Sequence, residues 1–139
     1  MDFGRYLEPG RVLHLFCRFP HGIEKHKLLV LADNDEECLF FVVNSEINPF
    51  IEQRQHLRDQ QIFLSSPDHD FLSHDSWLAC HEAFPMARAE VLHQICENPD
   101  GCLREVIGDE LKRKIIETVR RSLTLTSLDI QLIATSLSD

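Results

Sequence analysis

The segment 67–84, PDHDFLSHDSWLACHEAF, gathers residue types that bind metals or transfer protons. Zinc accepts His, Cys and carboxylate ligands, and a catalytic zinc commonly takes three of them plus a water. His69 and His74, however, are five residues apart, a spacing that places them together on neither a helix face nor a strand face. We therefore interpret residues 67–75 as a polar turn, in which aspartates commonly bond their own backbone, and predict no metal and no cofactor.

The rest of that segment, from Ser76 on, has the composition of a β-strand. Successive strand side chains point to opposite faces, so Cys80 and His81 cannot form a nucleophilic dyad. No GxSxG elbow surrounds the serines and the five glycines do not cluster, which excludes a serine-hydrolase elbow and a phosphate-binding loop. Alternation predicts a core face with Leu78, Cys80 and Phe84 and an opposite face with Trp77, Ala79 and His81.

The elements that must position these residues are short strands in the first part of the chain. The apolar segments 11–19, 26–32 and 38–44 have strand length, and the polar turn 33–37 favours a hairpin between the last two. Together they predict a meander of three antiparallel strands. Residues 48–60 suit a short amphipathic turn, and 61–65 and 76–84 suit further strands. Residues 87–95 fit a strand or a helix, and we favour a strand there.

The C-terminal part of the chain has helical periodicity instead. Leu111, Ile115, Val119 and Leu123 recur every four residues after an acidic start, which predicts an amphipathic helix. A second helix is expected over 128–137, capped by Thr126 or Ser127. We predict a mainly β domain over residues 1–100 and a helical segment over 101–139 that packs on this domain or on a partner subunit.

Charge is distributed unevenly along the 139 residues, whose net charge is −9. Residues 1–100 hold 8 Lys or Arg against 17 Asp or Glu, whereas residues 101–139 hold 6 of each. A nucleic-acid partner would therefore have to be bound through a local patch, because affinity for phosphates depends on positive charge. The basic residues 112–114, with Arg120 and Arg121, form either the solvated face of a helix or a docking face for RNA or an acidic partner.

The cysteine pattern and the N-terminal sequence indicate the compartment. The five cysteines are an odd number without a CxxC pair, which disfavours a disulfide framework and a zinc ribbon. The N-terminus lacks the basic and apolar regions of a signal peptide, and the longest apolar run is too short to span a membrane. These features predict a cytoplasmic protein without a membrane partner.

Four segments in order, PGRVLHLFCRF, KHKLLVLAD, FFVVNS and HDSWLACHEAF, resemble the MazF/PemK family of toxin–antitoxin endoribonucleases. Their family counterparts are a PGDIVWVDF-type strand, an RPVLVLS-type strand, a strand ending in Thr or Ser, and an HDSYVDCSEL-type segment. The resemblance covers most of residues 9–123. It implies a small SH3-like β-barrel followed by helices, a homodimer, a cognate antitoxin or other protein partner, and metal-independent cleavage of single-stranded RNA.

The resemblance also implies roles for individual residues. Lys27 stands where the family has a basic residue, and Asn44 and Ser45 stand where it has Thr or Ser. The Arg-x-Asp pair of the PemK branch corresponds to Ala79 and His81, so the catalytic set is incomplete. A non-catalytic interaction module of the same fold that binds a protein partner is the alternative function, and an unrelated small barrel is a third interpretation. The predicted catalytic residues are Lys27, His81, His14 and Ser45, and the predicted substrate-binding residues are Asn44 and Trp77.

Overall fold

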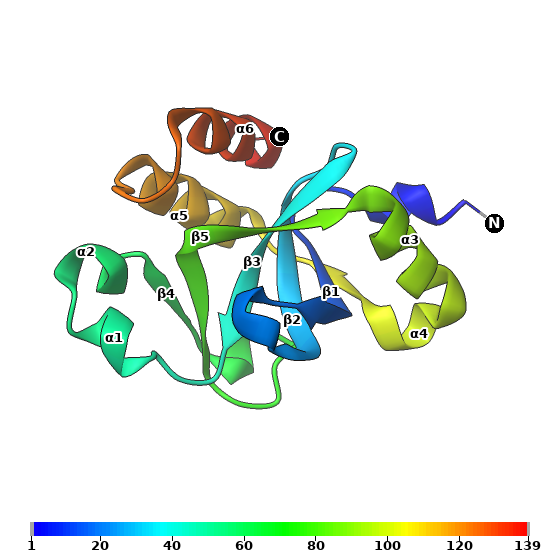
Figure 1. Cartoon of the computed structure of the whole chain (residues 1–139), viewed down its shortest axis with the longest axis horizontal. Helices are drawn as coiled ribbons and strands as arrows, with labels where there is room; N and C mark the ends of the chain where they lie inside the picture. The colour runs from blue at the N-terminus through cyan, green and yellow to red at the C-terminus, as the bar shows by residue number, and fades with distance from the viewer. Residues whose placement is uncertain (1, 139) are drawn as a thin grey trace.

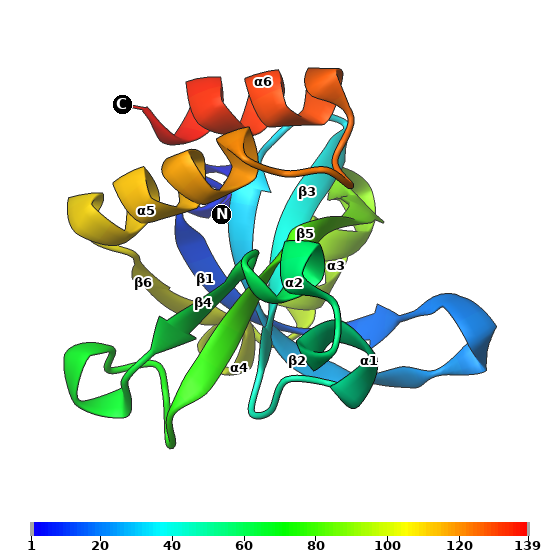
Figure 2. The same cartoon turned by 90° about the vertical axis from the view of Figure 1, so that its left-hand side faces the viewer.

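The computed structural model of the chain describes residues 2–138. Within them, a six-stranded antiparallel sheet is flanked by helices, and the two C-terminal helices lie together along one side (Figures 1 and 2). Three short 3-10 helices are present: η1 (Phe3–Tyr6), η2 (Pro20–Gly22) and η3 (Ser66–Asp68). The strands are β1 (Arg11–Arg18), β2 (Glu24–Asp33), β3 (Glu37–Asn44), β4 (Gln61–Leu64), β5 (Ser76–Ala87) and β6 (Leu103–Val106). The helices are α1 (Pro49–Glu52), α2 (Gln55–Arg58), α3 (Arg88–Glu97), α4 (Pro99–Cys102), α5 (Asp109–Arg120) and α6 (Ser127–Leu137).

The sheet has the strand order β4-β5-β3-β2-β1-β6. The predicted meander of β1, β2 and β3 is confirmed, as are the strands predicted at β4 and β5. β4 and β6 are the edge strands of this open sheet, which does not close into a barrel. The described chain therefore adopts a mixed architecture with an antiparallel sheet and C-terminal helices.

Both faces of the sheet are buried, each against its own helices. One core contains Phe41 and Leu78 and is covered by α5 and α6, which contribute Ile115 and Ile133. The other core contains Leu29 and Phe40 and is covered by α3, with Val91 and Ile95. Burial on both faces explains why the central strands are near-continuous apolar runs rather than strictly alternating ones.

The two C-terminal helices form as their periodicity predicts. In α5 the residues Leu111, Ile115 and Val119 are buried, and Asp109 lies in the favourable first turn. In α6 the Thr126 side chain accepts a hydrogen bond from the Asp129 backbone nitrogen at 3.1 Å, as the predicted cap requires. This helix packs on the sheet of its own chain. The expected helical segment also contains β6, an edge strand of the sheet that the sequence analysis missed.

Residues 88–97 form a helix, so the strand favoured for that region was wrong. Helix α3 buries Val91 and Ile95, which lie four residues apart on one helical face. Its first residue, Arg88, donates a backbone hydrogen bond to the Glu36 carbonyl at 2.8 Å, which fixes the end of β5 beside the β2–β3 turn. The spacing of the two apolar residues was the available signal for a helix.

A bulge in β5 overturns the predicted facing of Phe84. Val42 pairs with Ala79 whereas Phe40 pairs with Phe84, so two steps along β3 match five along β5. The surplus is an odd number of residues, and an odd surplus exchanges the two faces of a strand. Phe84 therefore packs in the α3 core, on the face opposite Leu78. Figure 1 shows the bend in β5 that accompanies this irregularity.

Among residues 2–138, no helix is long and apolar enough to cross a bilayer.

Candidate functional site

Three of the predicted site residues line one cleft on the α3 face of the sheet. Lys27 lies on β2, Asn44 at the end of β3 and His81 on β5, three strands that are neighbours in the sheet. The cleft has a volume of about 510 Å³. We call it the Lys27 cleft and define its sheet side by Lys25, Lys27, Asn44, Ala79, His81 and Glu82.

Lys27 is held by an amide and partly withdrawn from water. Its Nζ donates a hydrogen bond to Asn44 Oδ1 at 2.9 Å across the β2–β3 pair. Burial, and secondarily the neighbouring positive charge of Lys25, lower the pKa of the Lys27 ammonium. A half-buried ammonium with fewer competing waters interacts more strongly with an incoming anion than one on an open surface does.

The β1–β2 hairpin forms the outer wall of the Lys27 cleft. At its tip His21 has a φ of 67° and is followed by Gly22 with a φ of 79°. A non-glycine residue in this left-handed region is uncommon and carries backbone strain. Phe19 packs on Phe84 with ring centroids 4.7 Å apart, which joins the hairpin to β5. The hairpin thus presents an imidazole and an aromatic surface to the same cleft.

His81 is oriented by an amide that sequence reasoning did not single out. Gln61 Nε2 lies 3.1 Å from the Leu57 carbonyl oxygen and 2.9 Å from His81 Nδ1. Because a carbonyl only accepts hydrogen bonds, the amide must turn its NH₂ toward both groups. His81 Nδ1 is therefore an acceptor, and the neutral ring carries its proton on Nε2. That N–H lies 3.9 Å from Glu82 Oε2.

Burial keeps the His81 ring neutral, because it lowers the pKa of the imidazole, while the nearby Glu82 carboxylate opposes this with a smaller raising effect. The His81 side chain is only 17% exposed. As arranged, His81 can donate a hydrogen bond into the cleft. It cannot act as a base there until Gln61 turns its oxygen toward Nδ1.

His14 lies on the opposite face of the sheet from Lys27. On β1 it pairs with Leu28, whereas Lys27 pairs with Leu15, and adjacent strand residues point to opposite faces. His14 opens into a second cleft of about 370 Å³ under the β4–β5 loop. We call it the His14 cleft and define its polar lining by His14, His26, Ser45, His74 and Arg104. Lys27 of β2 also borders this cleft.

The predicted set is thus divided between the two clefts. Lys27, Asn44 and His81 meet in one, while His14 and Ser45 belong to the other. Trp77 packs edge-on against Phe63, with ring centroids 5.1 Å apart, and lines neither cleft. The residues that sequence reasoning missed are Gln61, Glu82 and Arg104, because their positions become informative only when the strands are paired.

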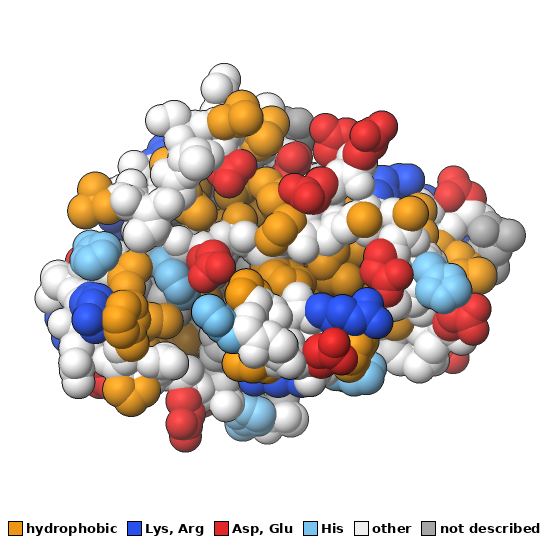
Figure 3. Space-filling view, viewed as in Figure 1, with side chains coloured by type: hydrophobic (Ala, Val, Ile, Leu, Met, Phe, Trp, Pro, Cys, Tyr) orange, Lys and Arg blue, Asp and Glu red, His pale blue; other side chains and the backbone are white. Residues whose placement is uncertain are grey.

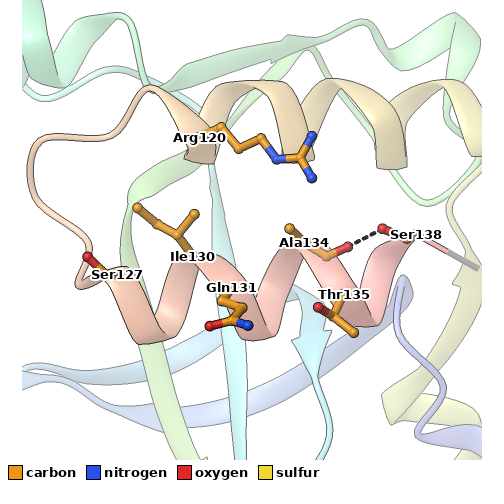
Figure 4. Close-up of a pocket in the computed structure, with 7 residues that line it drawn as sticks. All are labelled: Arg120, Ser127, Ile130, Gln131, Ala134, Thr135 and Ser138. Atoms are coloured by element: carbon orange, nitrogen blue, oxygen red, sulfur yellow. Dashed lines mark hydrogen bonds between the residues drawn. The ribbon is translucent and has the colours of Figure 1, made fainter.

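A third hollow lies between α5 and α6 and is shown in Figure 4. Arg120 of α5 extends into the space between the two helices, and Ile130, Ala134 and Ser138 border this space from the side of α6. Its lining contains no imidazole, thiol or carboxylate. Among residues 2–138 as a whole, no three His, Cys, Asp or Glu side chains are grouped so that they could hold a metal ion.

The outer surface is predominantly acidic, as the net charge requires. Figure 3 shows hydrophobic side chains in the middle of the face and acidic side chains around them. By contrast, the Lys27 cleft has two lysines and one carboxylate in its lining, and the His14 cleft has a lysine, an arginine and no carboxylate. In both clefts the basic side chains therefore outnumber the carboxylates, as phosphate binding requires.

Comparisons with known proteins do not assign a family. No family model matches the sequence, and no curated protein matches it significantly.

Proposed function

We propose that this protein is MazF/PemK-like, and that it binds single-stranded RNA in the Lys27 cleft and cleaves it without a metal. The observation that supports this most is the convergence of Lys27, Asn44 and His81 from three adjacent strands. These are the positions to which the resemblance gives a cation, a polar positioning group and a proton-transfer group. The same proposal includes three further statements. The open sheet is related to the SH3-like barrel of that family, the chain forms a homodimer, and an antitoxin is its protein partner.

Metal-independent cleavage of RNA uses the neighbouring ribose as the nucleophile. The 2′-oxygen attacks the adjacent phosphorus while a base takes its proton. The bond between phosphorus and O5′ breaks and O5′ takes a proton, which leaves a 2′,3′-cyclic phosphate and a 5′-hydroxyl. The enzyme must therefore supply a base, an acid and a cation for the charge that develops on the phosphoryl oxygens.

The Lys27 cleft contains groups for each of these tasks. The Lys27 ammonium lies where it can bind a phosphoryl oxygen, and its lowered pKa makes it a better proton donor than an ordinary lysine. His81 Nε2–H supplies a second hydrogen bond to the phosphate. Because Gln61 occupies the acceptor nitrogen of His81, we assign the 2′-proton to Glu82, the carboxylate beside the ring.

The test is cleavage of a single-stranded RNA oligonucleotide by the purified chain in the presence of a metal chelator. We expect a product ending in a 2′,3′-cyclic phosphate, and no cleavage where the substrate carries a single 2′-deoxy substitution at the cut site. Lys27→Met should lower the activity by about 100-fold or more, while Arg5→Met, which removes an exposed cation on η1, should leave it unchanged. Equal activity of the two variants would contradict the assignment of the cleft.

A non-catalytic binding module is the second candidate, and two observations favour it. Ala79 lines the cleft where the family places its arginine, so one cation is absent. The acceptor nitrogen of His81 is also occupied. This module would bind a protein partner in place of RNA. If the chain neither binds nor cuts the oligonucleotide, and its expression does not slow bacterial growth, the binding module is the correct interpretation.

A further inference from the structure

The His14 cleft is a cationic cavity in an acidic protein. The chain has 23 Asp and Glu against 14 Lys and Arg, yet the residues that line this cleft include no carboxylate. Three imidazoles, from His14, His26 and His74, share it with the guanidinium of Arg104. These groups come from β1, β2, the β4–β5 loop and β6, so only the folded chain assembles them.

Arg104 is fixed in place without a neutralising partner. Its Nη1 donates to the Gly101 carbonyl at 3.0 Å and to its own neighbour, the Leu103 carbonyl, at 3.0 Å. Within residues 2–138, no carboxylate forms a salt bridge with Arg104. A guanidinium that is anchored through one nitrogen keeps its other donors for a ligand, and guanidinium geometry suits phosphate and carboxylate.

The imidazoles add further donors close to the guanidinium. The rings of His14 and His26 stack with centroids 5.5 Å apart. Burial first, and then the charges of Arg104 and His26, lower the pKa of His14, so the ring lies in a positive potential. An anion bound between them would relieve this repulsion and add charge-assisted hydrogen bonds.

The remaining lining of the cleft is partly apolar and partly hydroxyl. Leu28, Val43, Phe71 and Leu72 provide an apolar surface, and Ser45 and Ser73 provide hydroxyl groups. Ser73 Oγ lies 3.1 Å from His74 Nδ1, which holds that ring at the rim. The volume of about 370 Å³ lies within the range of small-molecule sites. An anionic group joined to a flat, largely apolar group matches both parts of the lining.

From these features we infer that the His14 cleft binds a nucleotide, with its phosphate between Arg104, His14 and His26 and its base against the apolar surface around Phe71. This site is separate from the Lys27 cleft and does not depend on RNA cleavage. The phosphate ester can belong to a free nucleotide or to a nucleotide within an RNA chain. The charged and titratable groups that share this cleft with His14 are His26 of β2, Arg104 of β6 and His74 of the β4–β5 loop, while Lys27 borders the cleft from the opposite face of the sheet.

The experiment is an NMR titration of the full chain that follows the histidine side-chain resonances. Adenosine 5′-monophosphate, inorganic phosphate and a single-stranded RNA oligonucleotide with a 5′-hydroxyl are the three probes. We expect the His14 and His26 resonances to shift, and binding to tighten as the pH falls, because His14 protonates beside the anion. Arg104→Gln should weaken binding by about tenfold or more, the loss of a charge-assisted contact.

The outcomes separate the two sources of phosphate and test the site itself. Shifts with the mononucleotide indicate a free nucleotide, and shifts with the oligonucleotide alone indicate an RNA chain. If none of the probes moves the His14 and His26 resonances, or if Arg104→Gln binds as tightly as the parent, the proposal is overturned. Should Arg104→Gln fail to fold, His14→Gln and Ser45→Ala replace it. His81→Gln is the control that changes only the Lys27 cleft.

Discussion

The Lys27 cleft and the His14 cleft lie on opposite faces of the same sheet and share one lysine, yet they differ in one chemical respect. The Lys27 cleft contains Glu82, a carboxylate beside an imidazole, whereas the residues that line the His14 cleft include none. A reaction that moves a proton needs both an acceptor and a donor, while holding an anion needs donors alone. The first cleft is therefore equipped for reaction and the second for binding.

The largest effect should come from Lys27, because it lines both clefts. Lys27→Met keeps the length of the side chain and removes its charge and its hydrogen bond to Asn44. We expect the rate of RNA cleavage to fall by about 100-fold or more, the usual consequence of removing one group that stabilises transition-state charge. Nucleotide binding in the His14 cleft should weaken only a few-fold, since Arg104 is intact.

Cleavage rates and NMR-derived affinities of Lys27→Met, measured beside Arg5→Met, check this difference. A variant that loses both properties to the same extent would mean that the two clefts are one continuous site.

Changing Gln61 should convert the donor in the Lys27 cleft into a base. In Gln61→Glu a carboxylate faces His81 Nδ1, so it raises the pKa of His81 and places a proton on Nδ1. Nε2 then presents a lone pair to the cleft, and the pH–rate profile of cleavage should change shape. The matched substitution Gln53→Glu, at an exposed position after α1, should leave the profile unaltered.

The NMR titration curve of His81 tests independently of activity whether Gln61 controls the protonation of the ring. An unchanged His81 curve in Gln61→Glu would show that the amide does not control the ring.

A smaller effect is expected on the stability of the fold at mildly acidic pH. The pKa values of His14 and His81 are lowered in the folded chain from their ordinary value of 6.5. Below pH 6.5 the unfolded chain therefore binds more protons than the folded one, and the free energy of unfolding decreases as the pH falls through this range. Stability above that range is unaffected by these two groups.

Urea denaturation at about pH 7.5 and about pH 5 measures this loss. The loss of unfolding free energy between the two pH values should be smaller in His14→Gln and in His81→Gln. His93 is exposed, and His93→Gln should lose as much stability as the parent. Inorganic phosphate should restore part of the stability at the lower pH in the parent and in His81→Gln but not in His14→Gln. Equal restoration in both variants would argue against phosphate in the His14 cleft.

The smallest effect is expected at Trp77. This side chain packs on Phe63 and lines neither cleft, so Trp77→Phe, which keeps an aromatic ring against Phe63, should change RNA affinity by less than about twofold. Fluorescence anisotropy of a labelled oligonucleotide measures it. A larger loss would support the role in substrate binding that the sequence predicted for Trp77.

Much of the fold could be predicted because its signals are local. The meander of β1 to β3 follows from apolar runs broken by one polar turn, and α5 and α6 follow from apolar spacing and from the Thr126 cap. α3 was mistaken because a short segment with two apolar residues fits either period. β6 was missed because a four-residue edge strand has almost no pattern of its own.

The candidate site was predicted in part for the same reason. Local alternation along β5 was enough to place His81 on the face opposite Leu78 and Cys80. Local alternation could not show which strands pair, or in which register they pair. Pairing separated His14 from Lys27 across the sheet and brought Gln61 to His81, and the bulge in β5 moved Phe84 to the other core.

The sequence by itself determined the strands β1 to β5, the terminal helices and the residue types available for chemistry, because side-chain period and capping depend on near neighbours. Only the tertiary structure decided that those residues form two clefts rather than one. Whether a side chain shares a cleft with another depends on strand register and on which helix covers which face, and both are set by contacts between residues far apart in the chain.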